Sequence, residues 1–206
     1  LSADAEVCAI VRNGERVDSL SAGEQGEVVL NVTPFYAEMG GEVGDTGTIT
    51  ADGVELQVTD TKAPEKGLVC HVVTVASGVL TVGMAVSAQV DVKRRACIAR
   101  NHTCTHILHA ALRQVLGAHV KQAGSYVGPD RLRFDFTHFE AVTPEELRAI
   151  EEQVNEEIWK ATPVTTIETD IDTAKSMGAM ALFGEKYGKR VRVVSIGDYS
   201  VELCGG

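Results

Sequence analysis

The sequence of 206 residues has no run of about 18 uncharged apolar residues, which excludes a membrane-spanning helix. Its first six residues, Leu1–Glu6, contain neither a basic nor an apolar segment, so we expect no signal peptide. There is also no initiator methionine, which suggests a fragment of a longer protein. Because 44% of the residues are hydrophobic and 23% are charged, disordered, collagen-like and low-complexity classes are excluded. A globular protein of one large or two small domains remains.

Cysteine is sparse, odd in number and widely spaced, which excludes a disulfide-rich secreted scaffold. We therefore predict reduced thiols and a cytoplasmic location. Cys8, Cys70, Cys97 and Cys104 fit the role of small buried hydrophobic residues. Cys204 differs, because it precedes two glycines that let the backbone fold around an ion.

The net charge of −10 argues at first against a nucleic-acid partner. The basic side chains are unevenly distributed, however, and residues 93–133 contain a single acidic residue, Asp130. The same segment holds eight basic residues: Lys93, Arg94, Arg95, Arg100, Arg113, Lys121, Arg131 and Arg133. A basic segment in an acidic chain is a candidate contact for a phosphate backbone. The alternative is a set of scattered, solvated surface charges.

Residues 1–92 have the pattern of an all-β domain. Runs rich in Val, Ile, Leu and Thr are separated by turn dipeptides such as Asn13-Gly14 and Asp52-Gly53, and they predict about five to seven short strands. Strands of this number and spacing favour a small barrel, which leaves no exposed sheet edge. The glycine-dense segment 34–47 is expected to form either a long hairpin loop or a close approach to another backbone.

The period becomes helical after Lys93, and an apolar stripe predicts a helix that ends near Leu116. Residues 131–136 alternate between polar and apolar, which predicts a strand with both arginines on one face. A second helix is expected to begin at Thr143, where a proline and a capping-box glutamate follow. Its expected buried stripe is Leu147, Ile150, Val154 and Ile158.

Strands near residues 164–167 and 191–196, with a short helix near 172–180, complete an α+β domain. We therefore predict an α+β protein with an N-terminal small β-barrel (residues 1–92). An α+β domain (residues 93–206), truncated at its C-terminus, is expected to carry the metal site.

His102 and His106 form the clearest chemical motif, because residues four apart on a helix lie one above the other and can bind one metal ion. A zincin-type protease is excluded, since Thr103 stands where the glutamate base would be. No Gly-x-Ser-x-Gly motif supports a serine hydrolase. Cys204 is a candidate third ligand, and His109 is either a supporting residue or has no role.

Several segments together resemble the editing domain of alanyl-tRNA synthetase. They are His-Thr-Cys-Thr-His at 102–106, Tyr-Ala-Glu-Met-Gly-Gly at 36–41, Arg-Phe-Asp-Phe at 133–136, Gly-Ala-Met-Ala-Leu-Phe-Gly-Glu-Lys-Tyr at 178–187 and Glu-Leu-Cys-Gly-Gly at 202–206. They occur in the same order as in that family and span nearly the whole chain. The resemblance implies a small barrel joined to an α+β domain.

The resemblance also implies one zinc ion held by His102, His106 and Cys204, with a fourth ligand, a histidine, expected beyond Gly206. Thr105 and Gln122 match residues that shape the aminoacyl pocket, so they are the candidate catalytic residues. Gly40 and Gly41 match a glycine motif that faces the editing site, and Arg131 and Arg133 are further substrate-binding candidates. Lys93, Arg94, Arg95, Arg131 and Arg133 are the candidate phosphate contacts.

The implied reaction is hydrolysis of tRNA(Ala) mischarged with serine or glycine. The implied partners are the tRNA(Ala) acceptor end and the rest of the synthetase polypeptide, without a membrane. Two alternatives stay open: a freestanding editing hydrolase that acts in trans, and a non-catalytic zinc module that binds RNA. The editing domain of threonyl-tRNA synthetase is related, but the barrel segment Glu38–Gly41 fits the alanyl type better.

Overall fold

The computed structural model describes residues 1–180 and 188–205. The chain separates into two compact units, Leu1–Ile98 and Ala99–Gly206. All five cysteines lie in the described ranges, and none of them forms a disulfide. Across the two described ranges, no helix has the length and apolar character needed to cross a membrane.

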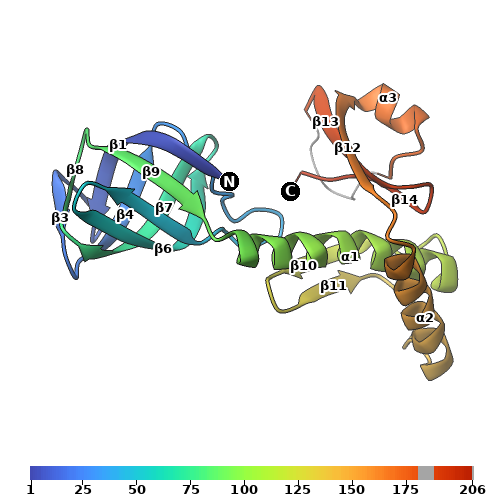
Figure 1. Ribbon diagram of the computed structural model, residues 1–206. Coiled ribbons are helices and arrows are strands. Elements are labelled where there is room, and N and C mark those ends of the chain that lie inside the picture. Colours follow the sequence, from blue (N-terminus) through green and yellow to red (C-terminus); the bar gives the residue numbers. More distant parts are fainter. Residues whose placement is uncertain (181–187, 206) are drawn as a thin grey trace. The chain divides into compact units, whose positions relative to one another are not determined.

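The first unit is a closed antiparallel barrel, coloured blue to green in Figure 1. Its six strands, in the order in which they pair, are β1 (Ser2–Arg12), β4 (Gln25–Leu30), β7 (Leu68–Ser77), β6 (Val54–Glu65), β5 (Gly47–Ala51) and β9 (Ala85–Val90). β9 pairs back with β1 and closes the ring. Three short strands lie outside it: β2 (Glu15–Val17) on β1, and β3 (Ser19–Ser21) paired with β8 (Val79–Thr81). The predicted barrel is confirmed.

Alternation along the strands fills the barrel interior. In β6, Val54, Leu56 and Val58 are buried while the residues between them are exposed. Side chains of this kind contribute about 1.5–3 kcal/mol each when fully buried, so the core is the main source of the unit's stability. The core consists of Val7, Ile10, Leu20, Val28, Leu30, Phe35, Ile49, Val54, Leu56, Val58, Val73, Val75, Leu80, Val86, Ala88 and Val90.

The glycine-dense segment is irregular between β4 and β5. Close backbone approach occurs at Gly44 and Gly47, where a Cβ atom would collide with the carbonyl oxygens of Thr61 and Gln89. Gly40 and Gly41 instead form an exposed turn with φ of 62° and 89°, a backbone conformation that favours glycine. The expected close backbone approach is therefore found at Gly44 and Gly47, whereas the expected hairpin loop is wrong, because β4 and β5 do not pair with each other.

The helix α1 (Val92–Leu116) begins in the barrel unit, where two of its cations are bound. The Arg95 guanidinium forms an ion pair with Asp45, which is 1% exposed, and its Nε donates to Asp45 Oδ1 over 2.8 Å. The Arg94 guanidinium donates to the carbonyl of Gly44. These two predicted phosphate contacts therefore anchor α1 to the barrel.

In the second unit, α1 packs against a hairpin and a second helix. The hairpin consists of β10 (Gln122–Val127) and β11 (Leu132–Phe136), and the helix is α2 (Pro144–Lys160). α1 ends as predicted, with Gly117 at a φ of 118°. Of these elements, β10 was not predicted. The shared core contains Ala111, Leu112, Val120 and Ile150, with Leu108, Val115, Leu116, Phe134, Phe136, Val142 and Val154 packed around them.

The predicted start of α2 is confirmed, because Thr143 and Glu146 form the complete capping box. The predicted buried stripe is wrong at both ends: Leu147 is 56% exposed and Ile158 is 46% exposed. Only the middle of the stripe, Ile150 and Val154, packs into the shared core, and the two ends project beyond it.

The rest of the second unit is a three-stranded antiparallel sheet that carries a short helix. Its elements are β12 (Val164–Asp170), α3 (Ile171–Ser176), β13 (Arg190–Ile196) and β14 (Ser200–Leu203). Asp170 caps α3, and the helix ends at Ser176 rather than near residue 180, since Gly178 follows with a φ of 78°. Residues 181–187 of the motif 178–187 lie outside the described residues.

Candidate metal centre

Three histidines share one face of α1. His102 and His106 are one helical turn apart, and their rings stack with centroids 5.2 Å apart and an angle of 21° between the planes. His109 follows three residues later and is 3% exposed. The predicted spacing therefore places three imidazoles along a single stripe of the helix.

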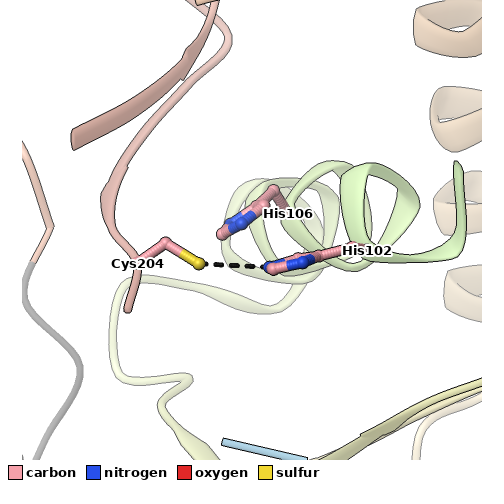
Figure 2. A group of neighbouring side chains, drawn as sticks. All are labelled: His102, His106 and Cys204. Atoms are coloured by element: carbon pink, nitrogen blue, oxygen red, sulfur yellow. Dashed lines mark hydrogen bonds between the residues drawn. The ribbon is translucent and has the colours of Figure 1, made fainter. Parts of the chain in front are cut away.

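The strand β14 and the residue that follows it bring two more polar side chains to this stripe. Glu202 and Cys204 are two positions apart, so the strand period directs both to the same side. The backbone N–H of Cys204 donates to the carbonyl of Arg192, which fixes the end of the strand. Cys204 Sγ lies 3.1 Å from His102 Nε2. Figure 2 marks this contact with a dashed line.

Glu202 bridges two of the histidines. Its Oε2 lies 2.6 Å from His106 Nδ1, and its Oε1 lies 2.9 Å from His109 Nδ1. The carboxylate is 2% exposed. These contacts leave the Nε2 atoms of His106 and His109 buried without a hydrogen bond to any described residue.

The buried charges at this centre support one another. Burial by itself would raise the pKa of Cys204, but the neighbouring His102 and His106 side chains outweigh it and lower the pKa to about 6. Burial likewise opposes the charge on His106, whereas Cys204 and Glu202 raise its pKa to about 9. Glu202 has a pKa of about 2, because His106 and His109 outweigh its burial. A thiolate is therefore available at neutral pH.

The donor set fits a metal ion that prefers nitrogen and sulfur. One ligand atom each from His102, His106 and Cys204 can be chosen so that all lie within 4.8 Å of one another. Tetrahedral zinc with bonds of about 2.0–2.3 Å separates its ligand atoms by about 3.5 Å, so small side-chain adjustments suffice. The buried Nε2 atom of His106 has no hydrogen-bond partner among the described residues, which indicates that this atom is available to bind a metal ion.

Thr105 and Gln122 occupy different environments. Thr105 is buried beside His106, and its hydroxyl donates to the Asn101 carbonyl over 2.8 Å. Gln122 is half-buried at the first position of β10, opposite Phe136 in the hairpin. The catalytic roles of both residues stay predictions.

The remaining candidate residues are exposed. The Arg131 guanidinium lies over the Tyr126 ring at 5.5 Å, and Arg133 forms an ion pair with Asp135. Both arginines are on the hairpin and are available to solvent. Gly40 and Gly41 belong to the barrel unit, and their place in a substrate site stays a prediction.

Comparison with known proteins shows relatives across the whole chain. The family model described as "tRNA synthetases class II (A)" matches residues 1–94. The alanine–tRNA ligase of Streptococcus thermophilus is 62% identical over 100% of this chain and 24% of its own length. This chain belongs to the alanine–tRNA ligase family. The corresponding enzymes of Acetivibrio thermocellus and Streptococcus mutans are 56% and 58% identical, over 99% and 98% of this chain and 23% of their own length.

The chain therefore spans about a quarter of the alanine–tRNA ligases that it matches. The resemblance seen in the sequence is confirmed at the level of this family. Sequence reasoning quoted Glu202 only as part of a motif and left its contacts unassigned. Its position two residues before Cys204 was the available signal, because alternate residues of a strand share a face.

Proposed function

We propose that this chain is the editing region of an alanyl-tRNA synthetase and hydrolyses tRNA(Ala) mischarged with serine or glycine. The supporting observation is the buried His102, His106 and Cys204 group, found in a chain that alanine–tRNA ligases match over its full length. The residues present fit zinc, with a fourth ligand expected beyond Gly206. The enzyme would act in the cytoplasm.

In the proposed reaction, water attacks the carbonyl carbon of the aminoacyl ester and the bond to the ribose oxygen breaks. The products are the free amino acid and an uncharged tRNA 3′ end. An ester of this kind is already labile, so holding water and substrate in line is the main task, and orientation contributes up to about 7–11 kcal/mol. Bound zinc supplies a positive centre that orients substrate groups or acidifies water.

Thr105 is the proposed reader of the serine hydroxyl. Since its own proton is donated to the Asn101 carbonyl, its oxygen has lone pairs left to accept a hydrogen bond from the substrate. Alanine has no such hydroxyl, so a site built around this bond discriminates against the correct product. Gln122 is the second proposed reader.

Arg131 and Arg133 are the proposed contacts for the tRNA backbone, because both are exposed on the hairpin. Arg94 and Arg95 are not proposed as tRNA contacts, because Arg94 donates to the Gly44 carbonyl and Arg95 forms an ion pair with Asp45. Phosphate contacts set affinity and make it depend on salt. Binding of tRNA(Ala) is therefore expected to weaken steeply between about 50 and 200 mM salt.

The decisive experiment is deacylation of seryl-tRNA(Ala) and alanyl-tRNA(Ala). It uses this chain and a form extended past Gly206, each with zinc and with a chelator. We expect selective hydrolysis of the seryl ester by the extended form, loss of hydrolysis in His102→Ala, and a reduction of about tenfold in Thr105→Val from one lost hydrogen bond. Binding of tRNA without turnover in either form would favour the non-catalytic zinc module.

A further inference from the structure

We propose that Glu202 is a positioning residue that sets the proton positions of His106 and His109. It keeps both Nδ1 atoms protonated, and so directs the Nε2 atom of His106 to the metal. This inference rests on the metal centre of the proposed function.

Hydrogen-bond chemistry fixes the direction of both contacts. An ionised carboxylate can only accept, so each imidazole must donate its Nδ1 proton to Glu202. A histidine binds a metal ion as the neutral imidazole, and with its one remaining ring proton held on Nδ1 the lone pair is on Nε2. Of the two nitrogens of His106, only Nε2 is then able to bind a metal ion.

Burial protects these hydrogen bonds from competition by water. Glu202, His106 and His109 are 2%, 6% and 3% exposed, so water does not compete for these hydrogen bonds. Both carboxylate oxygens are engaged, one by each ring. Removing one partner would leave a buried polar group unsatisfied, which is more costly than the bond itself is stabilising.

His109 gives the carboxylate a single orientation. A carboxylate with one partner can rotate about its terminal bond, whereas contacts at Oε1 and Oε2 fix its plane. The ring of His109 is itself held against Phe134, with centroids 5.1 Å apart. Phe134 thus supports His109, His109 orients Glu202, and Glu202 orients the ligand His106.

The same carboxylate also connects the two elements that supply the ligands. His106 lies on α1, and Cys204 follows two residues after Glu202 at the end of β14. The Glu202 contacts therefore hold the sulfur and the imidazole together before any ion is present. Residues that support a ligand in this way typically account for about 10–100-fold in metal affinity.

The test compares Glu202→Gln with the unchanged chain. The glutamine side chain has nearly the same shape but offers one acceptor and one N–H donor group. When both rings are neutral, one of them must then carry its proton on Nε2 instead of Nδ1. Ser200→Ala is the matched control, because Ser200 is also buried on β14 and its hydroxyl has no hydrogen-bond partner among the described residues.

Two quantities are measured in each protein. The first is zinc affinity, by competition with a chromophoric chelator. The second is the protonation of each ring nitrogen, from ¹⁵N chemical shifts of the histidines with and without zinc. For Glu202→Gln we expect zinc binding weaker by about 10–100-fold and one Nδ1 proton lost, while Ser200→Ala changes neither.

Each outcome decides a separate question. If either Nδ1 lacks a proton in the unchanged chain, or if Glu202→Gln keeps both protons and full zinc affinity, the positioning role is wrong. If the unchanged chain and the extended form bind no zinc, the metal centre of the proposed function is wrong. In the zinc-bound unchanged chain, the ¹⁵N shifts of His106 still decide whether Nδ1 keeps its proton and Nε2 binds the metal, even where the glutamine variant does not fold.

Discussion

His71 in the barrel and His106 in the second unit are both buried, yet their surroundings differ. His71 Nδ1 donates to the Val28 carbonyl over 2.8 Å, and Nε2 lies 2.7 Å from the Thr33 hydroxyl. Both of its nitrogens are therefore satisfied by the barrel itself. His106 has one nitrogen on Glu202 and the other without a hydrogen bond to the described residues.

This difference separates a structural histidine from a ligand. Burial lowers the pKa of His71, although the hydrogen bond to Val28 opposes the shift. The His71 ring is therefore neutral, and both of its nitrogens have partners. The environment of His106 does the opposite, since Cys204 and Glu202 outweigh its burial and raise its pKa to about 9. A buried imidazole whose remaining nitrogen faces a thiolate is arranged to receive a cation.

The largest expected effect is in the barrel core. Leu56→Ala removes a fully buried side chain and leaves a cavity, which should reduce the free energy of unfolding by about 2–5 kcal/mol. Amide hydrogen exchange can assign this loss to the barrel strands. Because the metal centre lies in the other unit, zinc affinity should stay unchanged, and a parallel loss of zinc binding would show that the two regions are not independent.

His106→Ala should have the converse effect. Removing a ligand is expected to weaken zinc binding by more than about 100-fold, beyond the range for supporting residues. Barrel hydrogen exchange should not change. His119→Ala is the matched control, because His119 also belongs to the second unit but stacks on His138 instead. Equal zinc affinity in His106→Ala and the unchanged chain would remove His106 from the ligand set.

Zinc itself should stabilise one unit selectively. Free zinc at 100 times its dissociation constant stabilises the folded site by about 2.7 kcal/mol. We expect slower hydrogen exchange in β14 and the middle of α1, and no change in β4 or β7. Uniform protection of both units would contradict a site confined to residues 99–206, and a chelator should reverse the effect.

The barrel could be predicted from the sequence because its strands and turns depend on neighbouring residues. Alternation directs Val54, Leu56 and Val58 inward, and dipeptides that contain glycine mark the turns. The sequence also predicted both ends of α1 and the cap at Thr143, where single residue types decide the geometry. The hairpin strand β10 was missed, since Gln122–Val127 contains glycine and serine with little alternation.

The metal ligands could be predicted from the sequence, but the residues that position them could not. Helical spacing pairs His102 with His106, and the glycines single out Cys204. The contacts of Glu202 depend on the packing of β14 against α1, across about 96 residues of sequence. The same limit applies to Arg95, whose charge suggested a phosphate contact until the tertiary fold placed Asp45 beside it.

The smallest expected effect tests the satisfied histidine. Because the pKa of His71 is lowered in the fold, the unfolded chain takes up its proton more readily once the pH falls below about 6.5. The barrel should thus lose stability as the pH falls from about 7 to 5, by at most about 1.4 kcal/mol per pH unit from this residue. Hydrogen exchange of the barrel strands across that range measures the slope. In His71→Gln the barrel starts less stable, but this part of the slope should disappear. An unchanged slope would mean that His71 does not cause the loss of barrel stability at lower pH.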